Sequence, residues 1–288
     1  MAIFFTLSGF LITHLLLQDD RAGPFLLKRV ARILPLAWAA MAVIALMWSE
    51  GRQNALANFL FVANLMPDTL MPGGHHLWSL CVEMQFYVFV AVLVLVGGRR
   101  ALYCLPFLCI AVTALRISDE EVISIVTWHR VDEILVGACI ALWWHHRPSS
   151  RRTQAGVRAW LPLVAFAGLI VCANPYLGEL GYLRPYFAAL AVGWSLAAFP
   201  MLFDRIFSSS PASYIASISY ALYVIHGVLG ETWLGGERAD KLTRYLLRAP
   251  LAICTWLLAH VSTNYYEAAF SRSARRILER LGPAPPTF

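Results

Sequence analysis

The sequence predicts an all-α integral membrane protein: a polytopic bundle of about nine transmembrane helices, forming a single domain over residues 1–288. Of its residues, 59% are hydrophobic and only 14% are charged, with a mean hydropathy of +0.62. A soluble domain carries roughly 25% charged residues, so too few charges are present to cover a soluble surface. Intrinsic disorder is excluded because it requires low hydrophobicity and high charge. Apolar runs recur along the chain, as expected of membrane spans.

Nine apolar segments are long enough to be read as spanning helices, which need about 20 largely apolar residues. In chain order they cover residues 1–18, 33–50, 77–97, 101–117, 131–146, 158–174, 184–203, 213–234 and 249–269. Residues 54–66 are apolar but too short to cross, and they predict an interfacial or re-entrant helix. Residues 270–288 are expected to form a tail outside the membrane.

The distribution of basic residues predicts the orientation. Loops on one side of the membrane, together with the tail, hold 15 of the 23 Lys and Arg residues. The positive-inside rule places that side, and the C-terminus, in the cytoplasm, with the protein in the cell (inner) membrane. Nine spans then place Met1 outside, so we expect a further helix upstream and about ten helices in all. The basic residues lie between apolar runs, which is not typical of a nucleic-acid-binding surface.

Several classes of site lack their sequence motif. HExxH, GxxxxGK[ST], GxGxxG and Cys/His metal clusters are all absent from the sequence, so neither a metal nor a permanently bound cofactor is expected. The six cysteines lie in apolar runs without a CxxC pair and are interpreted as small buried apolar groups.

Glu83 is the most informative polar residue in a predicted span. A charged side chain at membrane depth costs about 2.5–3.5 kcal/mol on insertion scales, so it needs a reason to be there. Ser79, Glu83 and Tyr87 are spaced by four and share a helix face, with Trp78 and Gln85 to its sides. Glu83 could be a general base or orient a cation. Alternatively, it is an interfacial carboxylate paired with a loop arginine.

Two further groups of polar residues open or line predicted spans. Arg130 and Glu133, at i and i+3, can pair beside Asp132, either as an ion pair at headgroup level or as a clamp on a substrate or donor. Tyr223 and His226 share a face with Ser219, next to Tyr220. His226 could shuttle a proton or simply be a hydrogen-bonded core residue.

Two other segments have alternative readings. Arg29 and Arg32, after Lys28, could face a phosphorylated ligand from the cytoplasm or serve only as topology anchors. Ser8 and Gly9 bring small residues into an aromatic helix, either for close helix packing or to line a ligand channel.

Five stretches, in this order, resemble acyltransferase family 3, a family of integral membrane O-acyltransferases. They are FFTLSGFLITHLLL, LLKRVARILPLAW, HHLWSLCVEMQFYVF, RVDEILVGACIAL and SISYALYVIH. The third, similar to the family pattern WSLxxExxFY, is the most specific. STNYYEAAFSRSARRIL resembles the closing segment of the family, with Ala268 in place of a proline after Glu267.

The resemblance implies transfer of an acyl group, usually acetyl, from cytoplasmic acyl-CoA as co-substrate to a hydroxyl of a carbohydrate, lipid-linked glycan or glycosylated acceptor within the membrane. It places Ser8, Gly9, Arg29 and Arg32 along the donor path, and Glu83, Arg130, Asp132 and His226 in a polar core. Glu83 and His226 are the expected catalytic residues. The expected substrate-binding residues are Ser8, Gly9, Arg29, Arg32, Trp78, Ser79, Arg130, Asp132, Tyr220 and Tyr223.

The chain departs from the family pattern at its start. The first helix of the family carries a basic residue and the His that is usually assigned as catalytic, just before the FFxxSGF pattern. Here only Met1 precedes Ala2, so we expect this sequence to be N-terminally truncated. The alternatives are a transporter or flippase of a lipid-linked or glycosylated substrate, for which intramembrane charges also fit, and an inactive acyltransferase remnant.

Overall fold

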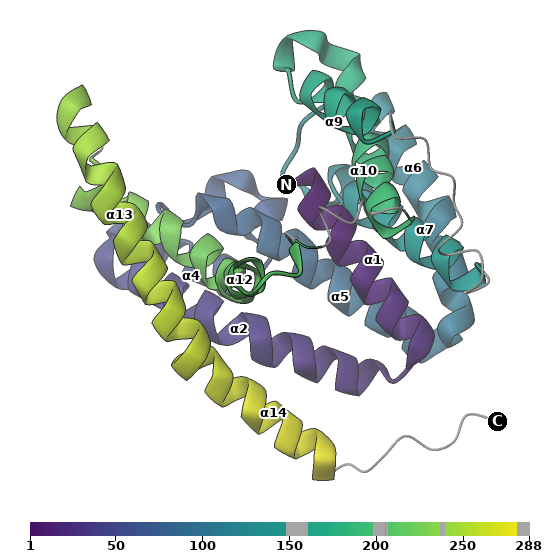
Figure 1. Ribbon diagram of the computed structural model, residues 1–288, viewed down its shortest axis with the longest axis horizontal. Helices are drawn as coiled ribbons and strands as arrows, with labels where there is room; N and C mark the ends of the chain where they lie inside the picture. The colour runs from purple at the N-terminus through teal and green to yellow at the C-terminus, as the bar shows by residue number, and fades with distance from the viewer. Residues whose placement is uncertain (148–160, 198–204, 206, 237–239, 281–288) are drawn as a thin grey trace. The chain divides into compact units, whose positions relative to one another are not determined.

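The computed structural model describes residues 1–147, 161–197, 205, 207–236 and 240–280, and every regular element among them is a helix (Figure 1). The chain divides into two compact units. The first comprises Met1–Ala22 and Val82–Ile206, and the second comprises Gly23–Cys81 and Phe207–Phe288.

The first unit is a helical bundle in which α1 packs along α7 and α10, α6 packs on α7, and α9 packs on α10 (Figure 1). Its elements are α1 (Ala2–Gln18), most of α5 (Trp78–Gly97), the 3-10 helix η4 (Arg99–Cys104), α6 (Leu105–Ser118), η5 (Thr127–His129), α7 (Asp132–His146), α9 (Leu161–Cys172), η6 (Pro175–Leu183) and α10 (Arg184–Ala197).

Two glycines set the approach of α1 to α7. A Cβ on Gly9 would lie 1.9 Å from the carbonyl oxygen of Ile134, and a Cβ on Gly137 would lie 2.0 Å from that of Thr6. Both distances are far below van der Waals contact, so only glycine permits this backbone-to-backbone packing. The structure therefore favours the packing interpretation of Gly9 over the channel-lining one.

The second unit contains the remaining elements, and within it α12 packs against α13. These are α2 (Ala22–Met47), α3 (Ser49–Gln53), α4 (Ala55–Phe59), three 3-10 turns η1 (Ala63–Leu65), η2 (Pro67–Thr69) and η3 (His75–Leu77), α12 (Ser210–Gly230), η7 (Trp233–Gly235), α13 (Lys241–Val261), the π-helical turn η8 (Ser262–Glu267) and α14 (Ala268–Arg280).

The structure supports the prediction of a membrane protein, but it does not confirm the predicted number of nine spans. Among the described residues, five helical stretches are long and apolar enough to cross a membrane: Ala22–Met47, His75–Gly97, Arg99–Ser118, Ser210–Gly230 and Lys241–Arg280. Ala2–Gln18 and Leu163–Cys172 are apolar but shorter. Large apolar side chains remain exposed on these helices, including Val92, Leu95 and Val96 on α5, as expected where lipid is the solvent.

Several predicted boundaries were wrong. Residues 22–32, expected in a loop, form the first turns of α2, because the cationic side chains there are compatible with a continuous helix. Residues 268–280, taken largely as tail, continue α13 as α14. The segment 54–66 forms two short helical pieces, α4 and η1, rather than one helix. Parts of the predicted spans 158–174 and 184–203, and the end of the tail, lie outside the described residues.

The cysteines are only partly as predicted. Cys81, Cys109 and Cys172 are buried, but Cys139 and Cys254 are half-buried and Cys104 is exposed. An apolar sequence environment places a residue in a membrane helix but does not decide whether it faces the protein or the lipid.

Candidate functional site

Glu83 lies in α5, where it joins two hydroxyl groups of the first unit. Its Oε1 accepts hydrogen bonds from the hydroxyls of Ser8, on α1, and Tyr87, one turn along α5. The Ser8 Oγ and Tyr87 oxygen are themselves 3.4 Å apart. Glu83 is 5% exposed, whereas Ser8 is half-buried. Since an ionised carboxylate only accepts hydrogen bonds, two converging donors suit the charged form.

The predicted face of α5 is only partly reproduced. Tyr87 joins Glu83 as expected, but the hydroxyl of Ser79 bonds to Tyr223, at 2.6 Å, and to the carbonyl of His76, at 3.3 Å. Gln85 accepts a hydrogen bond from Thr127, at 2.6 Å. Trp78 is partly exposed. The alternative interpretation, a Glu83 paired with a loop arginine, stays a prediction.

A buried set of charges, the arginine–carboxylate cluster, lies at the N-terminal ends of α7 and α10 and consists of Arg116, Arg130, Asp132, Glu133 and Arg184. Within it, Arg116 forms an ion pair with Asp132. Arg116 also donates to the carbonyls of Glu121, at 3.3 Å, and Val122, at 2.7 Å. This guanidinium is therefore well satisfied.

Glu133 is shared by the two other arginines of the cluster. Nε of Arg184 lies 2.7 Å from Oε1 of Glu133, and Nη2 of Arg130 lies 3.4 Å from Oε2. The predicted pairing of Arg130 with Glu133 is thus confirmed, and it is buried rather than exposed at a helix end. Burial lowers the pKa of Arg130 to about 10, and Glu133 opposes the shift. Arg130 remains charged at neutral pH.

Sequence reasoning missed Arg116 and Arg184 as partners in this cluster. Each stands at the end of an apolar run, next to a loop that the sequence analysis expects on the side with few basic residues. That scarcity is the only signal that could have identified them. The pairings join positions 16 and 51 residues apart, and such contacts depend on helix packing.

In the second unit, His76, Tyr223 and His226 form an aromatic cluster. The His76 ring centroid lies 4.9 Å from that of His226 and 5.3 Å from that of Tyr223. The Tyr223 hydroxyl bonds to Ser79 and donates to the carbonyl of His76. A Cβ on Gly227 would lie 2.0 Å from the His76 ring, so this glycine makes room for the imidazole. The sequence analysis did not single out His76.

The exposed His226 has one nitrogen committed to the backbone. Its Nδ1 lies 2.6 Å from the carbonyl of Tyr223, which can only accept, so Nδ1 carries the proton of the neutral ring. Nε2 is then left with the lone pair, which can take up a proton. His226 also lines an open cavity of about 480 Å³ with Tyr223, Arg248, Leu251 and Thr255.

Tyr220, Arg29 and Arg32 occupy other places in the second unit. The Tyr220 hydroxyl donates to the carbonyl of Ile33, at 2.6 Å, near the proline inside α2. Arg32 is exposed and within electrostatic range of Glu267. Glu267 is buried in the π-helical turn and accepts hydrogen bonds from Ser262 and Thr263. Tyr220 therefore contacts the backbone of α2, while a phosphate-binding role for Arg29 and Arg32 stays a prediction.

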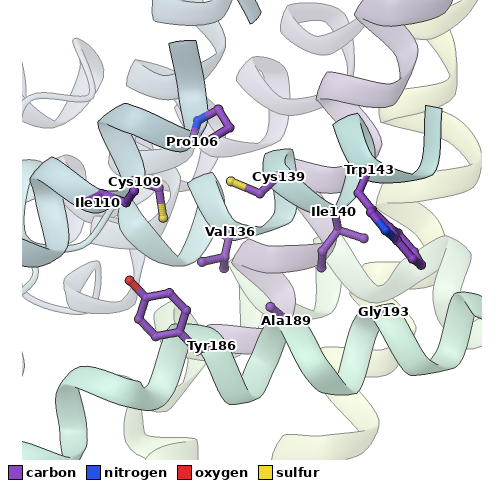
Figure 2. A pocket seen from close by; sticks show the side chains of 10 residues that line it. All are labelled: Pro106, Cys109, Ile110, Val136, Cys139, Ile140, Trp143, Tyr186, Ala189 and Gly193. Atoms are coloured by element: carbon purple, nitrogen blue, oxygen red, sulfur yellow. The ribbon is translucent and has the colours of Figure 1, made fainter. Parts of the chain in front are cut away.

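An apolar cavity of about 520 Å³ lies between α6, α7 and α10 of the first unit (Figure 2). Its lining includes Cys109, Val136, Cys139, Trp143, Tyr186 and Ala189. The Tyr186 hydroxyl bonds to Thr113, at 2.9 Å. The described residues contain no group of three or more His, Cys, Asp or Glu side chains placed to hold a metal ion.

Comparison with known proteins gives a consistent result. Residues 1–261 match the model of the acyltransferase domain of acyltransferase family 3. The peptidoglycan O-acetyltransferase OatA of Listeria monocytogenes is 23% identical over 78% of this chain and 43% of its own length. The putative peptidoglycan O-acetyltransferase YrhL of Bacillus subtilis is 26% identical over the same shares. The putative O-acetyltransferase SAR0937 of Staphylococcus aureus is 24% identical over 99% of this chain and 54% of its own.

The chain thus spans about half the length of the curated relatives it matches. No solved structure matches it.

Proposed function

The chain belongs to acyltransferase family 3 and is an acyltransferase, and from this premise we propose that it moves an acetyl group from acetyl-CoA to a hydroxyl of a membrane-associated carbohydrate acceptor. The names of the relatives, which include peptidoglycan O-acetyltransferases, support a glycan acceptor and an acetyl donor. The proposed partners are therefore acyl-CoA, a carbohydrate or lipid-linked glycan, and the surrounding lipids.

The observation that carries this proposal is the hydrogen-bonded group formed by Ser8, Glu83 and Tyr87. An alcohol attacks a thioester efficiently only if a base removes its proton in the transition state. The hydroxyl of Ser8 already donates a hydrogen bond to the Glu83 carboxylate. The Ser8 oxygen also has lone pairs with which it can accept a hydrogen bond from the acceptor hydroxyl. Ser8 is half-buried, so it is more accessible than Glu83.

The proposed reaction conserves atoms and charge. The acceptor hydroxyl gives its proton to Ser8 Oγ while Ser8 gives its own proton to Glu83. The acceptor oxygen forms the new C–O bond with the thioester carbonyl carbon. The C–S bond then breaks, and CoA leaves as a thiolate that recovers the proton from Glu83. Tyr87 keeps the carboxylate in place through its hydrogen bond.

His226 is the second proton-transferring residue that we propose. Its Nδ1 is held by the carbonyl of Tyr223, which leaves Nε2 for proton exchange. Its position in an open cavity is compatible with access by a substrate.

The test is acetyl transfer by the purified chain in lipid nanodiscs. Isotopically labelled acetyl-CoA and soluble peptidoglycan fragments are supplied, and base-labile O-acetyl product is measured by mass spectrometry. We expect Glu83→Gln to lower kcat by about 10²–10⁴-fold, the usual range for a general base. Glu179→Gln, which changes an exposed carboxylate, is the matched control and should leave kcat unchanged.

Three results would contradict the proposal. Normal turnover by the Glu83→Gln variant would remove Glu83 from the mechanism. If the wild-type chain transferred no acetyl group but accumulated glycan in sealed vesicles without acetyl-CoA, the transport alternative would replace it. A folded chain with neither activity would support the inactive remnant.

A further inference from the structure

The helix formed by α13, η8 and α14 is longer than a membrane is thick (Figure 1). It stays helical over the 40 residues Lys241–Arg280, which is about 60 Å at a rise of about 1.5 Å per residue. The hydrocarbon core of a bilayer is about 30 Å thick and takes about 20 residues of a crossing helix. About half of this helix therefore lies at or beyond the lipid headgroups.

The charges along this helix indicate which part lies inside the membrane. Residues 249–266 contain no Asp, Glu, Lys or Arg, and Tyr265 and Tyr266 close this uncharged stretch. Tyrosine is enriched at the boundary between the hydrocarbon core and the headgroups. Tyr266 also donates to the carbonyl of Pro35, at 3.3 Å, which ties this level of the helix to α2. We therefore expect α14, which begins at Ala268, to start at headgroup level.

One side of α14 is strongly basic. It carries four exposed arginines against one acidic residue, Glu279. These arginines are Arg272, Arg275, Arg276 and Arg280. Within the part of the chain that the structure describes, none of the four guanidinium groups forms a hydrogen bond or an ion pair. The residues that follow Arg280 in the sequence, LGPAPPTF, include no acidic side chain. The basic side of α14 is thus suited to an anion from outside the chain.

A neighbouring side of α14 is apolar and exposed. Tyr266, Phe270 and Ile277 lie on one stripe of the helix and are between 41% and 47% exposed. The ring centroids of Tyr266 and Phe270 are 5.2 Å apart. Ala274, on the adjacent face, is buried. An exposed apolar stripe beside a basic side is the pattern of a helix that lies in the membrane interface, where lipid satisfies both sides.

We propose that α14 is an interfacial helix that binds anionic phospholipids of the surrounding membrane. Phe270 and Ile277 enter the boundary between headgroups and acyl chains. Arg276 and Arg280, one turn apart and beside Ile277, bind the lipid phosphates through charge-assisted hydrogen bonds. Their long side chains reach the phosphates while the apolar stripe stays inserted. The π-helical turn η8 before α14 is a type of site at which helices commonly bend, which lets α14 follow the membrane surface.

Lipid selection can be measured on the intact chain without any acyl transfer. The purified protein is titrated in mixed micelles with equal amounts of phosphatidylglycerol, which is anionic, and phosphatidylcholine, which has no net charge. Native mass spectrometry measures how much of each lipid stays bound. Arg276→Gln/Arg280→Gln should weaken phosphatidylglycerol binding about 10–30-fold, since each arginine near an anionic surface contributes strongly to binding. Added salt should weaken wild-type binding too, because salt screens exposed charges.

Three further variants separate the contributions of α14 from a general attraction of charge. Arg52→Gln/Arg100→Gln removes the same charge at two exposed arginines outside α14 and should weaken binding far less. Glu279→Gln removes the acidic side chain from the basic side and should strengthen binding. Ile277→Asn keeps every arginine but loses the apolar insertion, so it should weaken binding, whereas Ile277→Leu should not.

Several outcomes would overturn the inference. One is an unchanged affinity for phosphatidylglycerol in the folded Arg276→Gln/Arg280→Gln variant, and another is an equal loss in the Arg52→Gln/Arg100→Gln control. Displacement of the lipid by inorganic phosphate would identify a site for free phosphate instead. A dimer that Ile277→Asn dissociates would identify the apolar stripe as a contact between two copies of the chain. The inference does not depend on the acyl donor or the acceptor, so loss of the proposed reaction would leave it standing.

Discussion

Gly137 of α7 touches the backbone of Thr6 in α1, and a Cβ at Gly137 would lie 2.0 Å from the Thr6 carbonyl oxygen. Gly9 makes the reciprocal contact with Ile134. The two glycines hold α1 close to α7. This position of α1 allows the hydroxyl of Ser8 to reach Glu83. The arrangement of the proposed proton relay therefore depends on two residues that have no side chain.

Gly137→Ala should force α1 and α7 apart. Overpacking in a closely packed interior typically costs about 1–3 kcal/mol, and here the obstacle is backbone that cannot rotate away. We expect a lower unfolding temperature and lower activity, measured on the purified protein in detergent. Gly193→Ala in α10, where an added Cβ meets nothing within 4 Å, is the matched control. Equal stability of the two variants would contradict the packing argument.

Ser8 and Tyr87 should be separable by their effects on kcat. Ser8→Ala removes the proposed relay and should reduce kcat by about 10²–10⁴-fold, whereas Ser8→Thr keeps a hydroxyl and should recover part of the rate. Tyr87→Phe removes only one hydrogen bond to a carboxylate, so we expect a loss of about 10–100-fold. Tyr176→Phe, at a residue that is 94% exposed, should have no effect. Full activity of Ser8→Ala would exclude the relay.

The pair Arg116–Asp132 should behave as a structural ion pair. Arg116→Met leaves the carboxylate of Asp132 buried without its partner, and such changes cost about 3–5 kcal/mol. The double variant Arg116→Met/Asp132→Leu removes both charges and should regain most of that stability. Unfolding by denaturant in micelles is measured for four proteins: the wild type, Arg116→Met, Asp132→Leu and the double variant. If the double variant were as unstable as the sum of the single ones, the two residues would not act as a pair.

Replacing His226 should lower kcat, whereas replacing His76 should lower stability. His226 is exposed, so His226→Asn should lower kcat by about 10²–10⁴-fold with little change in unfolding temperature. The His76 ring packs over Gly227 and lies 3.2 Å from the carbonyl of Val224, so His76→Asn should reduce stability. His75→Asn, at the exposed neighbouring position, is the control for both measurements. Unchanged turnover by His226→Asn would leave that residue without a catalytic role.

The sequence by itself determined the class of the protein and its family. Few charges, long apolar runs and the WSLxxExxFY-like segment indicate a membrane protein of acyltransferase family 3, because hydropathy and local motifs need no knowledge of packing. Local spacing also predicted the contacts between Glu83 and Tyr87 and between Arg130 and Glu133, since residues three or four apart on a helix must be neighbours.

Only the tertiary structure decided which distant side chains meet. The bonds from Ser8 to Glu83, from Ser79 to Tyr223 and from Arg184 to Glu133 join positions between 51 and 144 residues apart. Such pairs depend on the rotation and closeness of packed helices, which glycines such as Gly9 and Gly137 set and which hydropathy does not encode. The ion pairs of Arg116 with Asp132 and of Arg184 with Glu133 depend on helix packing for the same reason.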